Sequence, residues 1–240
     1  MNHRTTTSPT LRSFAAALAR LNARHPWNHN DHFHGWVLRH LPPRRRAALD
    51  MGCGLGGLVA RLADRFDRVD GIDADPVAVR WAARRFAADG RVTVREASFE
   101  DVRVPEGLAG YDLVTMVAVL HHLDLVRALA HARELLAPGG RLLVVGLARV
   151  ATPRDVAVDL VSSFANPVVG MVKHPRAVRP ARDDATGDPR DDPSAPPLVV
   201  MRDATETVDE ISAAARAVLP GVRVRRRLFF RYTLEWTAPR

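Results

Sequence analysis

The chain has very little cysteine, and this limits the kinds of site that it can build. Its 240 residues include one cysteine, Cys53, so neither a disulfide nor a cysteine-based zinc cluster can form within one chain. We therefore expect a reducing, cytoplasmic setting. Long hydrophobic runs are also missing, because no stretch approaches the roughly 20 apolar residues that cross a bilayer. Arg12 and Arg20 interrupt the apolar start of the chain, and neither a membrane span nor a secretory signal is predicted.

Lysine is almost absent, although the chain is strongly basic. The formal net charge is +8, yet Lys173 is the only lysine. A basic chain can bind nucleic acid or another anionic partner. Here the arginines are scattered and lack the interleaved aromatic residues on which nucleic-acid bases stack. The positive net charge is therefore better explained by a bias in amino-acid composition, and nucleic-acid binding is the weaker interpretation.

Apolar runs and helical segments alternate from residue 47 onward. Hydrophobic residues make up 47% of the chain, which is enough for one sizeable core. Strands that alternate with helices of about 10–15 residues indicate βαβ units and a parallel sheet. A Pro138-Gly139-Gly140 turn is expected before the strand at 141–146. The other expected strands are 47–51, 69–72, 92–95, 113–117, 222–226 and 228–236, and the expected helices are 57–65, 76–88, 125–136 and about 207–219.

Two regions lie outside this alternation. Before it, residues 10–24 have apolar positions on one helical face, and a second amphipathic segment covers 33–41. After it, residues 151–173 look helical, whereas 175–197 are dense in Pro, Asp and Arg and should be mobile. The chain is therefore divided into an N-terminal helical cap (1–44), a core (45–148), a helical and mobile insertion over the substrate side (149–203), and a last helix with two strands (204–240).

The strongest motif is the glycine-rich turn Asp50-Met51-Gly52-Cys53-Gly54-Leu55-Gly56-Gly57, which follows the first expected strand. Alternate glycines let the backbone turn tightly and approach a ligand closely, and the next helix offers free amide hydrogens. The following strand ends at Asp73, whose carboxylate can accept hydrogen bonds from both ribose hydroxyls of an adenosine. The turn and the acid together favour an adenosine ligand over a plain strand–helix turn. The glycine spacing alone also fits a dinucleotide.

The ordered set of motifs resembles the class I S-adenosylmethionine-dependent methyltransferases, of the type that acts on small molecules in quinone and natural-product biosynthesis. The turn from Asp50 to Gly56 is similar to the first motif of that family, and Asp73 to its ribose-binding acid. Segments 96–101, 111–114, 119–123 and 136–142 resemble its later motifs in order. The resemblance implies a doubly wound α/β fold. Its seven-stranded, mostly parallel sheet would end in an antiparallel hairpin, with strand seven between strands five and six.

The resemblance also implies roles for particular residues. The glycines of the turn would face the methionine moiety of S-adenosylmethionine, with Asp50 near its amino group. Asp73 would bind the ribose, and Ser98 or Phe99 would border the adenine. The residues expected at the cofactor are Asp50, Gly52, Cys53, Gly54, Gly56, Asp73, Ala74, Ser98 and Phe99.

Histidines are the candidate bases for methyl transfer. A base is needed only if the acceptor must lose a proton, because the protein mainly aligns the reactants and excludes water. His121 and His122 follow the fourth core strand, at the sheet end where open α/β folds bind ligands, although packing in the cofactor loop is the stronger interpretation for them. His34 is a third candidate, in a segment that could instead be a surface loop. His29 and His32 are further candidates in that segment, beside Trp27 and Trp36. A metal site from His29, His32 and His34 is not predicted, because no carboxylate spacing supports it.

We expect an enzyme that transfers a methyl group to an O, N or C atom of a small molecule. An RNA methyltransferase is one alternative, because of the basic charge, and a non-catalytic S-adenosylmethionine-binding protein is another. A nicotinamide-dependent reductase is disfavoured by the Pro138-Gly139-Gly140 turn and the C-terminal hairpin. Amide N-methylation of DNA or protein would need an Asn/Asp/Ser-Pro-Pro-aromatic turn where the chain has Ala118-Val119-Leu120-His121.

Overall fold

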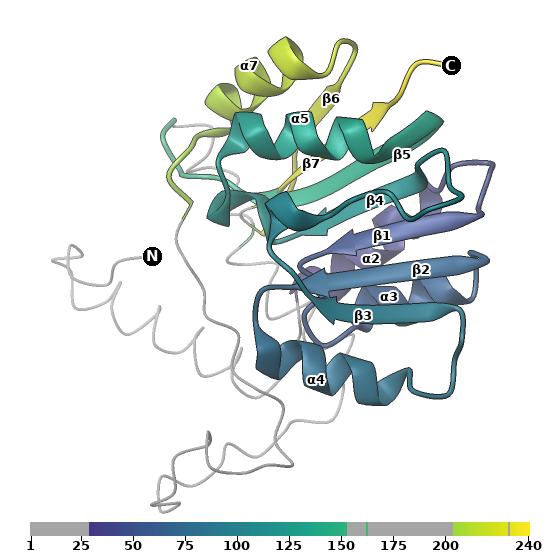
Figure 1. Ribbon diagram of the computed structural model, residues 1–240. Coiled ribbons are helices and arrows are strands. Elements are labelled where there is room, and N and C mark those ends of the chain that lie inside the picture. The colour runs from purple at the N-terminus through teal and green to yellow at the C-terminus, as the bar shows by residue number, and fades with distance from the viewer. Residues whose placement is uncertain (1–28, 153–161, 163–203, 230) are drawn as a thin grey trace, which may run out of the picture.

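A seven-stranded sheet organises the part of the chain that the computed structural model describes, which is residues 29–152, 162, 204–229 and 231–240 (Figure 1). The strand order is β3-β2-β1-β4-β5-β7-β6. The first five strands are parallel, and β7 runs antiparallel between β5 and β6. The doubly wound α/β fold and its C-terminal hairpin are confirmed. The strands are β1 (Ala47–Met51), β2 (Arg68–Asp73), β3 (Val92–Glu96), β4 (Tyr111–Val117), β5 (Leu136–Leu147), β6 (Arg223–Arg226) and β7 (Arg231–Thr237).

Helices cover both faces of the sheet (Figure 1). On one face lie α2 (His29–Arg39) and α3 (Gly57–Ala63), and α4 (Pro76–Arg85) packs beside β3 and β2. The other face carries α5 (Leu125–Leu135) and α7 (Val208–Val218). None of the described helices is long and apolar enough to cross a membrane. Two short 3-10 helices, η1 (Phe99–Asp101) and η2 (Leu120–His122), follow β3 and β4.

Local side-chain bonds fix where the helices begin. Asp75 accepts a hydrogen bond from the Val77 amide at 2.8 Å, and Pro76 is the first residue of α4. Thr207 and Glu210 form a complete capping box at the start of α7. Each such cap contributes about 1 kcal/mol.

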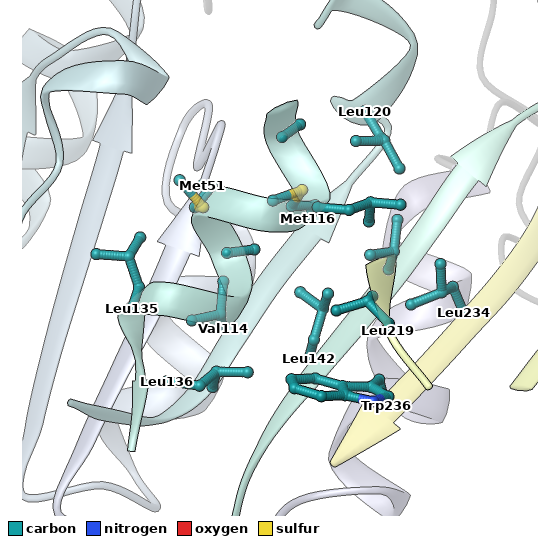
Figure 2. Packing of buried hydrophobic residues seen from close by; sticks show 14 of the residues in the cluster. Met51, Val114, Met116, Leu120, Leu135, Leu136, Leu142, Leu219, Leu234 and Trp236 are labelled. Carbon is teal, nitrogen blue, oxygen red and sulfur yellow. The ribbon is translucent and has the colours of Figure 1, made fainter. Parts of the chain in front are cut away.

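The alternation of side chains along the strands separates the core into two layers. In β1, Leu49 and Met51 point toward α5 and α7, whereas Ala48 points toward α2 and α3. Successive side chains of a strand point to opposite faces, so Asp50 shares the α2–α3 face with Ala48. Figure 2 shows the larger layer, where side chains of the strands meet α5. Its labelled members include Met51, Val114, Met116, Leu142, Leu234, Trp236 and Leu135.

The structure differs from the expected elements at β5 and in the N-terminal segment. Strand β5 begins earlier than expected, at Leu136 directly after α5, so Pro138-Gly139-Gly140 lies within the bounds of the strand and not before it. The chain still bends there, because Gly139 has φ +76° and the pairing with β4 shifts between Tyr111–Leu136 and Leu113–Arg141. In the N-terminal segment α2 covers 29–39 rather than 33–41. The helix expected at 10–24 and most of that at 151–173 lie outside the described residues, and the fourfold division of the chain stays a prediction.

Close packing at Gly146 of β5 gives a direct test of the sheet. A Cβ atom there would lie 2.3 Å from Tyr232 Oη, and Tyr232 is only 1% exposed. We expect Gly146→Ala to lower the free energy of unfolding by about 1–3 kcal/mol, the usual range for overpacking, as measured by urea denaturation. Gly90→Ala, where nothing lies within 4 Å of the added carbon, is the control. Equal stability of the two variants would contradict the packing described here.

Candidate functional site

The glycine-rich turn between β1 and α3 is hydrogen-bonded to the end of β2. The Gly52 and Cys53 amides both donate to the Ile72 carbonyl, at 2.8 and 2.9 Å. Gly52 has φ +70° and leaves no room for a side chain, because a Cβ there would lie 2.1 Å from Val119 Cγ2. Gly54 has φ +51°, and nothing lies within 4 Å of its Cβ position. The turn is therefore tight on one side and open at Gly54, where a ligand can approach the backbone.

Asp73, at the end of β2, is held in place by two backbone amides. Its Oδ2 accepts from the Gly54 amide at 2.8 Å, and its Oδ1 accepts from the Asp75 amide at 2.9 Å. The side chain is half-buried. A carboxylate has about four lone-pair positions, so both oxygens can still accept further hydrogen bonds. Asp73 is thus oriented by the glycine turn and is able to receive a pair of hydroxyl groups.

Asp50 is a buried acid beneath the same turn. It is 2% exposed, and Thr115 Oγ1 of β4 donates to its Oδ1 at 2.6 Å. Burial raises the pKa of Asp50 to about 7, and nearby Asp73 adds to the rise, while the Thr115 bond opposes it. A cation at the turn would stabilise the ionised form of this acid. The position therefore suits a positively charged ligand group.

The side chain of Cys53 points away from the open side of the turn. It is buried and packs with Ala48 and Val59 in the layer beneath α2 and α3. Burial raises the pKa of the Cys53 thiol above its usual value, and thiols in such surroundings are unreactive. Any contact that Cys53 makes with a ligand would involve its backbone.

A strained residue marks the end of β4, next to the turn. Ala118 has φ +59°, a region that residues other than glycine rarely adopt, and its amide donates to the Val145 carbonyl at 2.7 Å. Such strain occurs often at functional sites. Val119, the next residue, is the one that packs against Gly52. The rings of His121 and His122 follow, with centroids 4.1 Å apart, so both histidines lie beyond the strand end that borders the glycine turn.

Helix α2 brings His34 to the start of α3. The Cβ position of Gly57 lies 3.5 Å from His34 Cε1 and 3.7 Å from Asp31 Oδ1. His34 is buried, and its Nδ1 is 3.7 Å from Asp31 Oδ1. Trp36 is also buried, so the described part of this segment is a packed helix and not a surface loop. Trp27 and the side chain of His29 lie outside the described residues.

The segment after β3 is divided between two environments. Ser98 is exposed, and its Oγ donates to Asp101 Oδ2 at 2.7 Å. Phe99 is buried, and its ring packs edge-on against His131 of α5, with centroids 5.1 Å apart. Ser98 therefore faces solvent near the end of β3, whereas the Phe99 ring is directed into the core.

Known proteins share both the sequence and this arrangement. A family model described as a methyltransferase domain matches residues 49–142. An uncharacterized methyltransferase of Mycobacterium tuberculosis is 33% identical over 221 residues, which cover 89% of this chain and 98% of the relative. The chain belongs to the class I S-adenosylmethionine-dependent methyltransferases.

More distant similarities agree with this family. The mitochondrial ubiquinone biosynthesis O-methyltransferase of Schizosaccharomyces pombe is 31% identical over 117 residues, covering 47% of this chain and 42% of that protein. A SAM-dependent methyltransferase from Aquifex aeolicus shares the fold with a TM-score of 0.52 and 13% identity, covering 93% of this chain and 97% of its own. The family resemblance predicted from the motifs is thereby confirmed.

In this methyltransferase the structure gathers most of the predicted site residues at one edge of the sheet. Asp50, the glycine turn and Asp73 with Ala74 lie at the carboxyl ends of β1 and β2, and the two histidines follow β4. Thr115 and the strained Ala118 were not predicted, because only the register of β4 beside β1 reveals them. The individual roles of the predicted site residues stay predictions. Among the described residues no group of three His, Cys, Asp or Glu side chains could hold a metal ion.

The raised pKa of Asp50 predicts that this acid destabilises the ligand-free methyltransferase. The folded protein holds the Asp50 proton more tightly than the unfolded chain, so the cost of ionisation grows as the pH rises from about 4 to about 7. We expect Asp50→Asn to raise the melting temperature at about pH 8, with a gain that shrinks toward pH 4. The raised pKa sets an upper limit of about 4 kcal/mol on this gain.

Asp70→Asn is the matched control for this experiment. Asp70 is also buried in the sheet, but it accepts hydrogen bonds from Arg68 and Tyr111. Replacing this carboxylate weakens the buried hydrogen bond from the Tyr111 hydroxyl and removes the charge that Arg68 faces, so this variant should melt at a lower temperature than the wild type. An Asp50→Asn variant that is less stable than the wild type at about pH 8 would contradict this prediction. It would show that the folded protein stabilises the ionised Asp50 carboxylate.

Proposed function

We propose that this methyltransferase uses S-adenosylmethionine as its methyl donor and methylates an O, N or C atom of a small molecule. The hydrogen bond between the Gly54 amide and Asp73 carries this proposal. It joins the open point of the glycine turn to the acid expected at the ribose, so one ligand can contact both. S-adenosylmethionine would supply an activated methyl group on a sulfonium.

The residues present fit this cofactor at each of its polar ends. The buried carboxylate of Asp50 would pair with the donor's ammonium group, which favours the ionised acid. Asp73 would accept hydrogen bonds from the two ribose hydroxyls, with its carboxylate already oriented by the Gly54 and Asp75 amides. Ala74 and Ser98 lie exposed at the ends of β2 and β3, on the adenine side.

The acceptor would lie beyond the carboxyl end of β4. His121 and His122 are there, and α2 places His34 near the start of α3. Any of the three could take a proton from an acceptor hydroxyl or amine. The Schizosaccharomyces pombe relative is named an O-methyltransferase of ubiquinone biosynthesis, which supports a small-molecule acceptor.

Calorimetry with S-adenosylmethionine, S-adenosylhomocysteine and NADH tests the donor. We expect the first two to bind with one site per chain and Asp73→Ala to weaken both at least about tenfold, since it removes a hydrogen-bonded charge. Asp75→Ala is the matched control, because it removes an adjacent acid that caps α4 and should leave binding unchanged. Binding of NADH alone, or of none of the three by the folded protein, would refute the proposal.

The affinity for the donor should depend on pH through Asp50. The ligand-free acid has a pKa of about 7, and an ammonium beside it would lower that pKa, so binding below pH 7 must release a proton. We expect the affinity for S-adenosylhomocysteine, which carries the same ammonium, to fall as the pH drops from about 8 to about 5.5. Asp50→Asn should bind more weakly and lose this dependence. An equal pH dependence in both proteins would assign the effect to a different group, such as a histidine.

A further inference from the structure

A buried arginine lies at the ligand end of the sheet without an acid beside it. Arg231 is the first residue of β7 and pairs with Leu147, the last residue of β5. It is 7% exposed. Its Nη2 donates to Asn30 Oδ1 of α2 at 2.9 Å, whereas its Nε is buried without a hydrogen-bond partner. Within the ranges that the structure describes, no carboxylate forms an ion pair with this guanidinium.

Such a charge is costly for the ligand-free protein. Removing an ion from water costs several kcal/mol unless a counter-charge and hydrogen bonds compensate it. Desolvation lowers the pKa of Arg231 to about 10, which shows how strongly the surroundings disfavour the cation. The neutral amide of Asn30 offsets only part of this cost. An anion would neutralise the charge and use the donors that remain.

The position of Arg231 indicates which ligand would supply the anion. The first turns of α2 reach Arg231 through Asn30 and reach Gly57 through Asp31 and His34. The ends of β4 and β5 lie between these two contacts, since β7 is three strands from β1. Neighbouring strands are about 4.8 Å apart, so about 14 Å separates β7 from β1. Arg231 is therefore on the acceptor side of the glycine turn.

Phe229, two residues before β7, adds a second sign of a built site. Phe229 has φ +61°, a conformation that costs a bulky residue of order 1–3 kcal/mol. Its ring meets His32 of α2 with centroids 5.7 Å apart. Its backbone amide is held by a hydrogen bond that it donates to Ser162 Oγ at 2.8 Å. This aromatic pair joins the same two segments as the Arg231–Asn30 bond, with each ring two residues from a partner of that bond.

We propose that Arg231 binds an anionic group of the methyl acceptor, either a carboxylate or a phosphate. The substrates would then be small organic acids or phosphate esters, because a guanidinium binds either anion through paired, charge-assisted hydrogen bonds. This inference rests on the proposed function, since it assigns the acceptor of that same site.

Anion binding by the purified protein tests this assignment. The wild type, saturated with S-adenosylhomocysteine, is titrated with succinate and separately with inorganic phosphate at constant ionic strength. We expect at least one of the two probes to bind saturably in calorimetry and Arg231→Gln to weaken that binding at least tenfold. Arg231→Lys should keep part of it. Arg227→Gln is the matched control, because Arg227 is half-buried in the same hairpin but donates to Thr233, and this variant should bind like the wild type.

Two further measurements separate the alternatives. Without anions, Arg231→Gln should melt no lower than the wild type, because it removes an uncompensated charge. A lower melting temperature together with no probe binding by the wild type would overturn the proposal and leave Arg231 a structural role. An affinity for S-adenosylhomocysteine that falls tenfold in Arg231→Gln would assign the anion to the cofactor's carboxylate, which also overturns it. If the wild type binds no S-adenosylhomocysteine, the proposed function fails, and the titrations repeated without that ligand still test Arg231.

Discussion

The hydrogen bond from the Gly54 amide to the Asp73 carboxylate joins the two strand ends on which the site depends. Gly54 can donate this bond because the turn folds back with positive φ angles, and the turn is held to β2 by the Ile72 carbonyl. Parallel pairing of β1 with β2 brings Asp50 opposite Gly71, so the turn and Asp73 extend from the same sheet edge. A change in the register of β2 would separate the acid from the turn. The geometry of the site is therefore a consequence of the sheet.

Two buried ionisable groups of opposite charge lie at this end of the sheet. Asp50 lies beneath the turn with a raised pKa, and Arg231 lies three strands away with a lowered one. Each is unfavourable in the empty site, and each would be compensated by a ligand group of the opposite charge. Groups placed in advance need little rearrangement when the ligands bind. A protein built in this way is less stable when empty, and its ligands stabilise it by mass action.

The sequence predicted best those features that depend on neighbouring residues. The strand at Ala47–Met51 has the expected bounds, and the caps at Asp75 and Thr207 form as their side chains indicate. The start of β5 was misplaced, because the pairing of Leu136 with Tyr111 extends the strand back to α5, while Gly139 at φ +76° keeps the local bend that Pro and Gly favour. A residue whose importance arises only from strand pairing, such as Arg231, has no local signal at all.

The candidate site also explains why a methyltransferase can be identified more readily than its acceptor. The proposed donor site consists of a tight turn and two acids, and these are encoded in one continuous stretch from β1 to the end of β2. The proposed acceptor groups are far apart in the chain, with Asn30 of α2 meeting Arg231 of β7 and His121 following β4. Methyl transfer depends mainly on alignment, so these dispersed groups can change without loss of the donor site. The acceptor must therefore be inferred from charge and position, and the uncompensated guanidinium is the charge that the described structure supplies on that side.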